Sequence, residues 1–338
     1  MKTLFSFACL AFLVASCGNT KLKVEQISSV YLEYSPATNL NFGSSFEARI
    51  LAMMHNGDEL DITTHRKLDF ISADVSKSGK KFTIVKRPSN FDENGVAVAF
   101  SVSDKDETFE ARDSIYMNFQ GGLSINGSGS WGADGEDQKD RGSRILLRDG
   151  KPGDDGTNGE PGFTGGNYEA HIWKEGELYY LYVRDLNSIS AWKYKTLATS
   201  TVLFNLSGGV GGRGGKGGGG GDGKDGSKDD DGKVKRPGDG GPGGHGGHGG
   251  NGGNGGSIHV VLHTNASDIS PQLKYNLSGG SGGEAGKGGQ GGQAGDALEG
   301  QAGGSTGASG RSGQAGNWGA SGNSTVEFKV FDFSQFKQ

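Results

Sequence analysis

The feature that most constrains this chain is a glycine tract in which the non-glycine residue returns at every third position. From Asp239 to Ser257 the sequence reads D-G-G-P-G-G-H-G-G-H-G-G-N-G-G-N-G-G-S, with no slip in phase. A second run keeps this period from Ser281 to Asp296, where alanine twice replaces one glycine of the pair. Two further runs, 150–165 and 304–322, carry one strict glycine per triplet. A phase kept over this length indicates a regular structure.

A period of three suits polyproline-II geometry, which has three residues per turn and no internal hydrogen bonds. The backbone N–H and C=O groups must then bond to neighbouring segments, and G-G-X leaves two edges of each helix free of side chains. We therefore interpret the runs as packed polyglycine-II helices. A flexible glycine linker is one alternative, but a linker has no reason to keep phase. A collagen triple helix is another, but G-G-X lacks the side chains that collagen carries at two positions of its triplet.

The glycine runs belong to a longer repeat. The junction F-N-L-S-G-G starts at Phe204 and returns as Y-N-L-S-G-G at Tyr275, and a degenerate copy starts at Leu123. Glycine triplets lead back into predicted strands at 168–173, 258–264 and 325–333. The predicted unit is a strand, a glycine helix outward, a tip loop, a glycine helix back and a strand. Three units place about six glycine helices on a β base over residues 120–338.

This arrangement resembles the glycine-rich N-terminal domain of Obg-family GTPases and the receptor-binding adhesins at some phage tail-fibre tips. The resemblance covers residues 120–334 and is carried by the G-G-X phase and the order of the elements. It implies a polyglycine-II bundle. No GTPase domain follows, so the resemblance does not imply GTP hydrolysis.

Residues 25–119 have a different character, with short alternating runs at 30–34, 46–52, 82–85, 96–102 and 114–119. Turn signals, including Asn56-Gly57, separate these runs. Short strands at this spacing predict a β-sandwich, and the pattern resembles the bacterial immunoglobulin-like domains of surface proteins. The predicted fold class is mainly β, with almost no α-helix beyond the first residues.

The N-terminus is typical of a secretory signal. Lys2 precedes an apolar stretch from Leu4 to Val14, and small residues lead into Cys17. The segment resembles a bacterial lipoprotein signal with its lipobox. That resemblance implies a signal peptide at 1–16, lipid on Cys17 and a tether at 17–24. It also implies attachment to the outer membrane of a Gram-negative bacterium, on either its surface or its periplasmic face, because Gly18 is not the inner-membrane retention signal.

Charged side chains gather in the second predicted tip loop. The candidate contact residues there are Asp222, Asp225, Asp229, Asp230, Asp231, Lys233 and Arg236. The loop imitates the start of an EF-hand but has no glutamate at its twelfth position, so a solvated loop is favoured over a calcium site. His245 and His248 are interpreted as a solvated face, because two ligands do not complete a zinc site. We expect no metal and no cofactor.

Other activities are excluded or disfavoured by the sequence. Gly218 to Lys224 matches a phosphate loop in part, but Asp225 replaces the required hydroxyl residue. No catalytic constellation can be picked out, so we do not expect an enzyme. A net charge of -5 does not suggest nucleic acid as a partner. Trp131 and Trp318 lie in matching W-G-A contexts, each a few residues from its base strand. Each could be a platform on which a ligand stacks, but this location favours a hydrophobic plug between bundle and base.

Two functional hypotheses remain. In the first, a lipid-anchored binding or adhesion protein presents the tip loops 136–149, 222–237 and 296–302 to a protein or glycan. In the second, the chain is a structural spacer or an accessory subunit of a cell-envelope complex. Its contacts would then lie on decorated edges of the bundle such as Arg213, Lys216 or Gln290.

Overall fold

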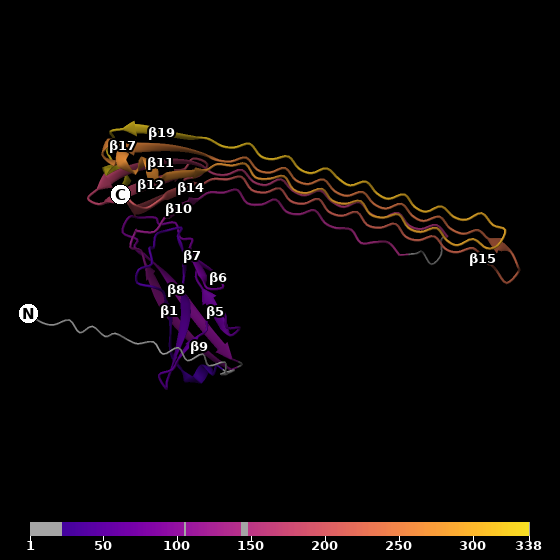
Figure 1. Ribbon diagram of the computed structural model, residues 1–338, viewed down its shortest axis with the longest axis horizontal. Coiled ribbons are helices and arrows are strands. Elements are labelled where there is room, and N and C mark those ends of the chain that lie inside the picture. Colours follow the sequence, from indigo (N-terminus) through magenta and orange to yellow (C-terminus); the bar gives the residue numbers. More distant parts are fainter. Residues whose placement is uncertain (1–21, 105, 143–147, 338) are drawn as a thin grey trace, which may run out of the picture.

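The computed structural model describes residues 22–104, 106–142 and 148–337, and in these residues the chain is mainly β, as predicted (Figure 1). The helical elements of the described residues are short 3₁₀ segments: η1 (Val24–Gln26), η2 (Thr264–Gln272) and η3 (Ser334–Phe336).

The N-terminal region contains three antiparallel sheets, in the orders β1-β3-β4, β2-β7-β6 and β5-β8-β9. The strand bounds are β1 (Ile27–Glu33), β2 (Ser45–Glu47), β3 (Arg49–Met54), β4 (Glu59–Asp61), β5 (Leu68–Ile71), β6 (Val75–Ser78), β7 (Lys81–Ile84), β8 (Gly95–Asp104) and β9 (Glu107–Tyr116). Alternate side chains of these strands point into a common core, where Phe46 stacks on Phe82 and Phe70 packs against Phe100.

Two of the predicted strands in this region have bounds that differ from those expected. The run 46–52, which reads as one strand, is split at Ala48, because β2 and β3 pair in different sheets. The run 114–119 is the end of β9, which begins at Glu107 as the partner of the long strand β8. Local alternation therefore located strands well and their ends poorly.

The base of the second region consists of two sheets. Strands β10 (Leu123–Asn126), β14 (Val202–Asn205) and β18 (Leu273–Asn276) form one parallel sheet. Strands β13 (Ala191–Leu197), β12 (Leu178–Asp185), β11 (Asn167–Glu175), β17 (Ser257–His263) and β19 (Ser324–Lys329) form the other, in that order. The sequence repeat sets the register, since Phe204 pairs with Tyr275 and Asn205 with Asn276. All three predicted return strands are present as β11, β17 and β19.

The two base sheets share one apolar core, to which Ile125, Phe204, Ala170 and Val260 all contribute buried side chains. The other face of the larger sheet is covered by the C-terminal segment. There Phe333 stacks on Trp173 and Phe336 stacks on Tyr182.

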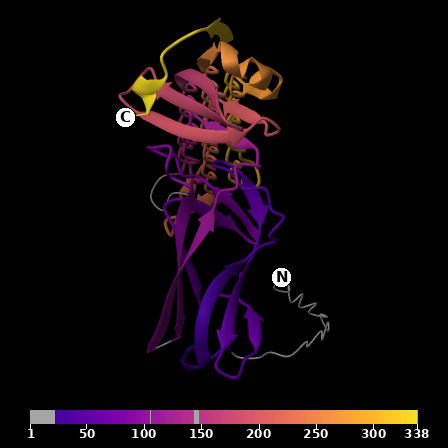
Figure 2. The same cartoon turned by 90° about the vertical axis from the view of Figure 1, so that its left-hand side faces the viewer.

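The N-terminal region is fixed to the base by a buried polar contact. The Asn41 Nδ2 group donates to the Lys195 carbonyl at 3.2 Å and to Thr196 Oγ1 at 3.3 Å, and Asn41 is fully buried. Ser124 of β10 donates its N–H to the Phe42 carbonyl at 3.2 Å. The N-terminal region therefore covers one edge of the smaller base sheet (Figure 2).

Six glycine-rich tracts leave the base side by side and form a long rod (Figure 1). We number them in chain order as T1 (127–142), T2 (150–166), T3 (207–226), T4 (238–256), T5 (278–296) and T6 (304–322). T1, T3 and T5 run outward in one row, and T2, T4 and T6 return in a second row.

Backbone hydrogen bonds join the tracts at every third residue. Within a row the bonds run between parallel tracts, as from Gly211 N to Ser281 O at 2.9 Å. Between rows they join antiparallel tracts, as from Gly253 N to Gly209 O at 2.8 Å. T3 and T4 each bond to four other tracts, whereas T1 and T6 each bond to two.

The number of glycines per triplet follows this packing. T3 and T4 carry G-G-X because two of their three edges face other backbones, while T6 keeps one glycine per triplet. A Cβ at Gly250 would lie 1.9 Å from the Glu160 carbonyl oxygen, closer than any side chain allows. The glycines are therefore required by close approach of backbones.

We predict that Gly250→Ala destabilises the protein by about 3 kcal/mol or more, because neighbouring tracts must separate to admit the methyl group. Gly303→Ala is the matched control, since a Cβ there meets nothing within 4 Å. Urea denaturation of both variants measures the difference. Equal stability of the two variants would contradict this packing.

Candidate functional site

The outer surface of the rod carries ladders of hydrogen bonds from side chains to backbone. Short acceptors at the X position of one tract receive the N–H of the X residue in the next tract of the same row. His245 Nδ1 accepts from Arg311 N at 2.9 Å, and Asn251 Oδ1 accepts from Asn317 N at 2.9 Å. Asp, Asn and His all place an acceptor at the same distance from Cβ, which explains why these types share the position.

Two of the predicted tip residues belong to these ladders. Asp222 Oδ1 accepts from Gln293 N at 2.7 Å, and Asp225 Oδ1 accepts from Asp296 N at 2.8 Å. Both carboxylates thus fasten T3 to T5 near the end of the rod. His245 and His248 lie on an exposed edge, as predicted. Both imidazoles also accept a backbone hydrogen bond in a ladder, through their Nδ1 atoms.

The second tip loop forms a hairpin at the far end of the rod (Figure 1). Strands β15 (Ser227–Lys228) and β16 (Val234–Lys235) pair antiparallel. Asp229 closes the turn, because its carboxylate accepts from Lys233 N at 2.8 Å and its carbonyl accepts from Gly232 N at 2.9 Å. Gly232 has φ +75, a conformation that favours glycine.

Arg148 holds this hairpin on the rod. Its Nη1 donates to the carbonyl oxygens of Asp225 and Arg236, and its Nη2 donates to Ser227 Oγ at 2.6 Å. One guanidinium therefore joins the first tip region to both ends of the hairpin. The sequence reasoning missed Arg148, because nothing local distinguishes this arginine from a solvated one.

Arg236 belongs to a small ion-pair group beneath the hairpin. Its Nη2 lies 3.2 Å from Asp149 Oδ2, and its Nη1 lies 3.9 Å from Asp239 Oδ2. The N–H of Asp239 and the Arg236 charge together hold the pKa of the Asp149 carboxyl below its usual range. This predicted contact residue thus has an intramolecular role.

Three of the predicted residues remain directed outward. Asp230, Asp231 and Lys233 lie exposed at the turn, and their side chains have no hydrogen-bond or ion-pair partner within the described part of the chain. Among the described residues, no group of three or more His, Cys, Asp or Glu side chains could hold a metal ion. The third tip contains a tight turn at Gly300, where Gln301 N donates to Leu298 O at 3.0 Å.

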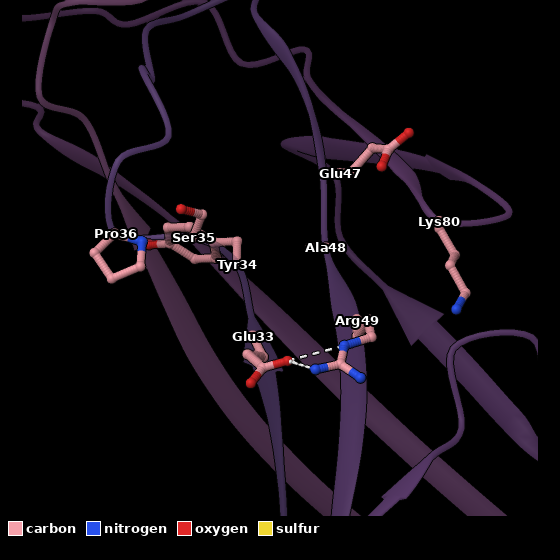
Figure 3. A pocket seen from close by; sticks show the side chains of 8 residues that line it. All are labelled: Glu33, Tyr34, Ser35, Pro36, Glu47, Ala48, Arg49 and Lys80. Carbon is pink, nitrogen blue, oxygen red and sulfur yellow. Dashed lines mark hydrogen bonds and ion pairs between the residues drawn. The ribbon is translucent and has the colours of Figure 1, made fainter. Parts of the chain in front are cut away.

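A second candidate site is an open cavity of about 540 Å³ on the N-terminal region (Figure 3). It is lined by Tyr34, Pro36, Glu47 and the pair Glu33 and Arg49, among others. Arg49 Nε donates to Glu33 Oε2 at 2.9 Å, and Lys80 at the rim pairs with Asp61 at 2.9 Å. Because both cations are already paired, this cavity offers little to orient a charged ligand.

The prediction for the two tryptophans was wrong. Trp131 and Trp318 are each 77% exposed, and Phe163 at the same level of the rod is 61% exposed. The reason is the packing, since the other edges of T1 and T6 face neighbouring tracts and leave the tryptophan edge in solvent. The junction with the base is filled instead by Tyr168, which lies against Gly127.

Comparison of the chain with known protein families, curated proteins and solved structures found no match in any of the three. Cys17, the predicted lipid-anchor residue, lies outside the described residues, as do the predicted signal peptide at 1–16 and part of the predicted first tip loop. Within the described ranges, no helix combines the length and hydrophobicity needed to cross a bilayer.

We predict that Arg148→Gln frees the hairpin and accelerates tryptic cleavage after Lys228, Lys233 and Lys235, because three hydrogen bonds to the loop are lost. Lys151→Gln, which removes an exposed cation from the adjoining tract, should leave the cleavage rate unchanged. Mass spectrometry of timed digests measures both. Unchanged cleavage in Arg148→Gln would show that the hairpin is held by other contacts.

Proposed function

We propose that this chain is a lipid-anchored binding or adhesion protein whose rod presents the hairpin 227–235 to a protein or glycan. The observation that carries the proposal is the placement of exposed, unpaired charges on a hairpin at the far end of a long rod (Figure 1). Asp230, Asp231 and Lys233 are the side chains most available to a partner. Exposed loops on a rigid scaffold are a common design for binding.

The rigidity follows from the proposed nature of the tracts, which we interpret as polyglycine-II helices. A β-strand bonds to neighbours on two sides only, whereas T3 and T4 bond to four other tracts at every third residue. That pattern suits a threefold helix. At about 3.1 Å per residue, T4 would be about 60 Å long.

The N-terminal region would serve as the stalk. We propose that its three antiparallel sheets form an immunoglobulin-like sandwich over residues 25–119. The buried contact of Asn41 with Lys195 and Thr196 supports a fixed angle between stalk and rod. A tether at 17–24 would join the stalk to the lipid on Cys17 in the outer membrane.

Replacement of the proposed anchor gives a direct test. Cys17→Ser should abolish incorporation of labelled palmitate and move the protein from the membrane to the soluble fraction, because several acyl chains are needed for stable anchoring. Cys9→Ser, within the proposed signal peptide, is the control and should keep both properties. Retention of label in Cys17→Ser would rule out this anchor.

A second candidate function is a structural spacer or accessory subunit. The exposed Trp131, Phe163 and Trp318 favour it, because exposed aromatic side chains on the flank of a rod suit a lateral protein contact. The two functions differ in which part of the rod touches other molecules.

Site-specific cross-linking in intact cells separates them. A photo-reactive amino acid at position 230 should capture a partner, whereas one at Gln290, on the flank of T5, should not. Capture from position 290 alone would overturn the adhesion proposal and favour the spacer. Protease treatment of unlysed cells then reports which face of the membrane the rod occupies.

A further inference from the structure

The two ends of the repeat differ in whether other parts of the chain cover their edge strands. At the first end, the N-terminal region covers β10, with Ser124 N bonded to Phe42 O and Arg87 bonded to the Asn126 carbonyl. At the other end, β18 and β19 are the edge strands of their sheets. No described residue pairs with their outer edges.

The apolar side chains of β19 lack the cover that its neighbour has. Val260 pairs with Val326 and Leu262 pairs with Phe328, so these residues share the core-facing side of the sheet. The two β17 side chains are 0% exposed, whereas Val326 is 41% and Phe328 is 55% exposed. The smaller sheet ends at β18, one strand short of covering β19.

The chain itself indicates what would fill this place. The three strands of the smaller sheet read L-S-I-N, V-L-F-N and L-K-Y-N. Their first and third residues face the core, and their asparagines form a ladder, with Asn276 Nδ2 donating to Asn205 Oδ1 at 2.8 Å. A fourth strand of this pattern would pair with β18 and cover Val326 and Phe328.

A second copy stacked head to tail fits poorly. The β10 strand that it would offer is already bonded to its own N-terminal region. The X residues of T5 and T6 also differ from those of the inner tracts, because Glu284, Lys287 and Arg311 do not place a short acceptor for a next tract. The rod therefore has no site for a further tract at this end, whereas the base still has an open strand edge.

We propose that the edge formed by β18 and β19 is a docking site for an extended strand of another protein, with an apolar-x-apolar-Asn sequence. The partner strand would add in parallel to β18, and its two apolar side chains would be buried against β19. Strand addition of this kind takes affinity from backbone bonds and specificity from alternate side chains.

A peptide taken from the repeat tests the site. A fluorescent synthetic peptide with the sequence of residues 201–212, which contains V-L-F-N, should bind the full chain saturably in fluorescence anisotropy. Phe328→Asp should weaken binding about tenfold or more, because it would bury a carboxylate among apolar side chains. Lys329→Asp, on the opposite face of the same strand, is the matched control and should bind normally.

A peptide with Phe204 replaced by serine gives a test that does not depend on how any protein variant folds, and it too should bind about tenfold or more weakly. Absence of saturable binding at millimolar peptide would overturn the proposal. So would equal binding by Phe328→Asp and Lys329→Asp. If sedimentation shows that the chain dimerises and that Phe328→Asp makes it monomeric, the occupant is a second copy, and the partner-strand proposal is wrong.

Discussion

The rod depends on backbone hydrogen bonds between tracts that contribute almost no side chains to each other. A glycine amide such as Gly250 N reaches the Gly212 carbonyl at 2.8 Å, while a Cβ on Gly250 would lie 1.9 Å from the Glu160 carbonyl oxygen of another tract. Each bond adds only about 1 kcal/mol to the net stability, while ordering glycine is costly. Such a rod is therefore stable only if the bonds form together and if a folded base holds the tracts in register.

The base and the ladders supply that register. Paired strands such as β14 and β18 fix where each tract begins, and the fixed offset is then carried along the rod by every triplet. Acceptors such as Asp155 and Asn254 bond the N–H groups of X residues in the next tract of the same row. The short acceptors of the inner tracts are in this sense part of the fold, whereas the tip charges, the exposed aromatic side chains and the open base edge take no part in it.

The sequence predicted the outline of this structure because glycine phase and strand alternation are local signals. These signals were enough to predict the mainly β fold, the three return strands and the strand-to-glycine junctions. Three features could not be predicted from the sequence, because they depend on contacts between residues far apart in the chain. Asp222 and Asp225 read as free charges, although each bonds to a tract about seventy positions away. Arg148 gave no signal of its role in holding the hairpin, and Trp131 was placed between bundle and base because it lies a few residues from its base strand.

The central claim is that the glycine tracts form an ordered, hydrogen-bonded rod, and hydrogen exchange of individual backbone amides by NMR tests it most directly. The account predicts strong protection of the amides of Gly244, Gly247 and Gly250, which donate to T3. It predicts rapid exchange at Ser309 and Ser312, whose amides face solvent on the outer edge of T6. Protection of all three amides of a T4 triplet, with rapid exchange at every third amide along T6, would support the rod. Uniform exchange at the rate of an unfolded chain would show a flexible glycine linker and contradict the account.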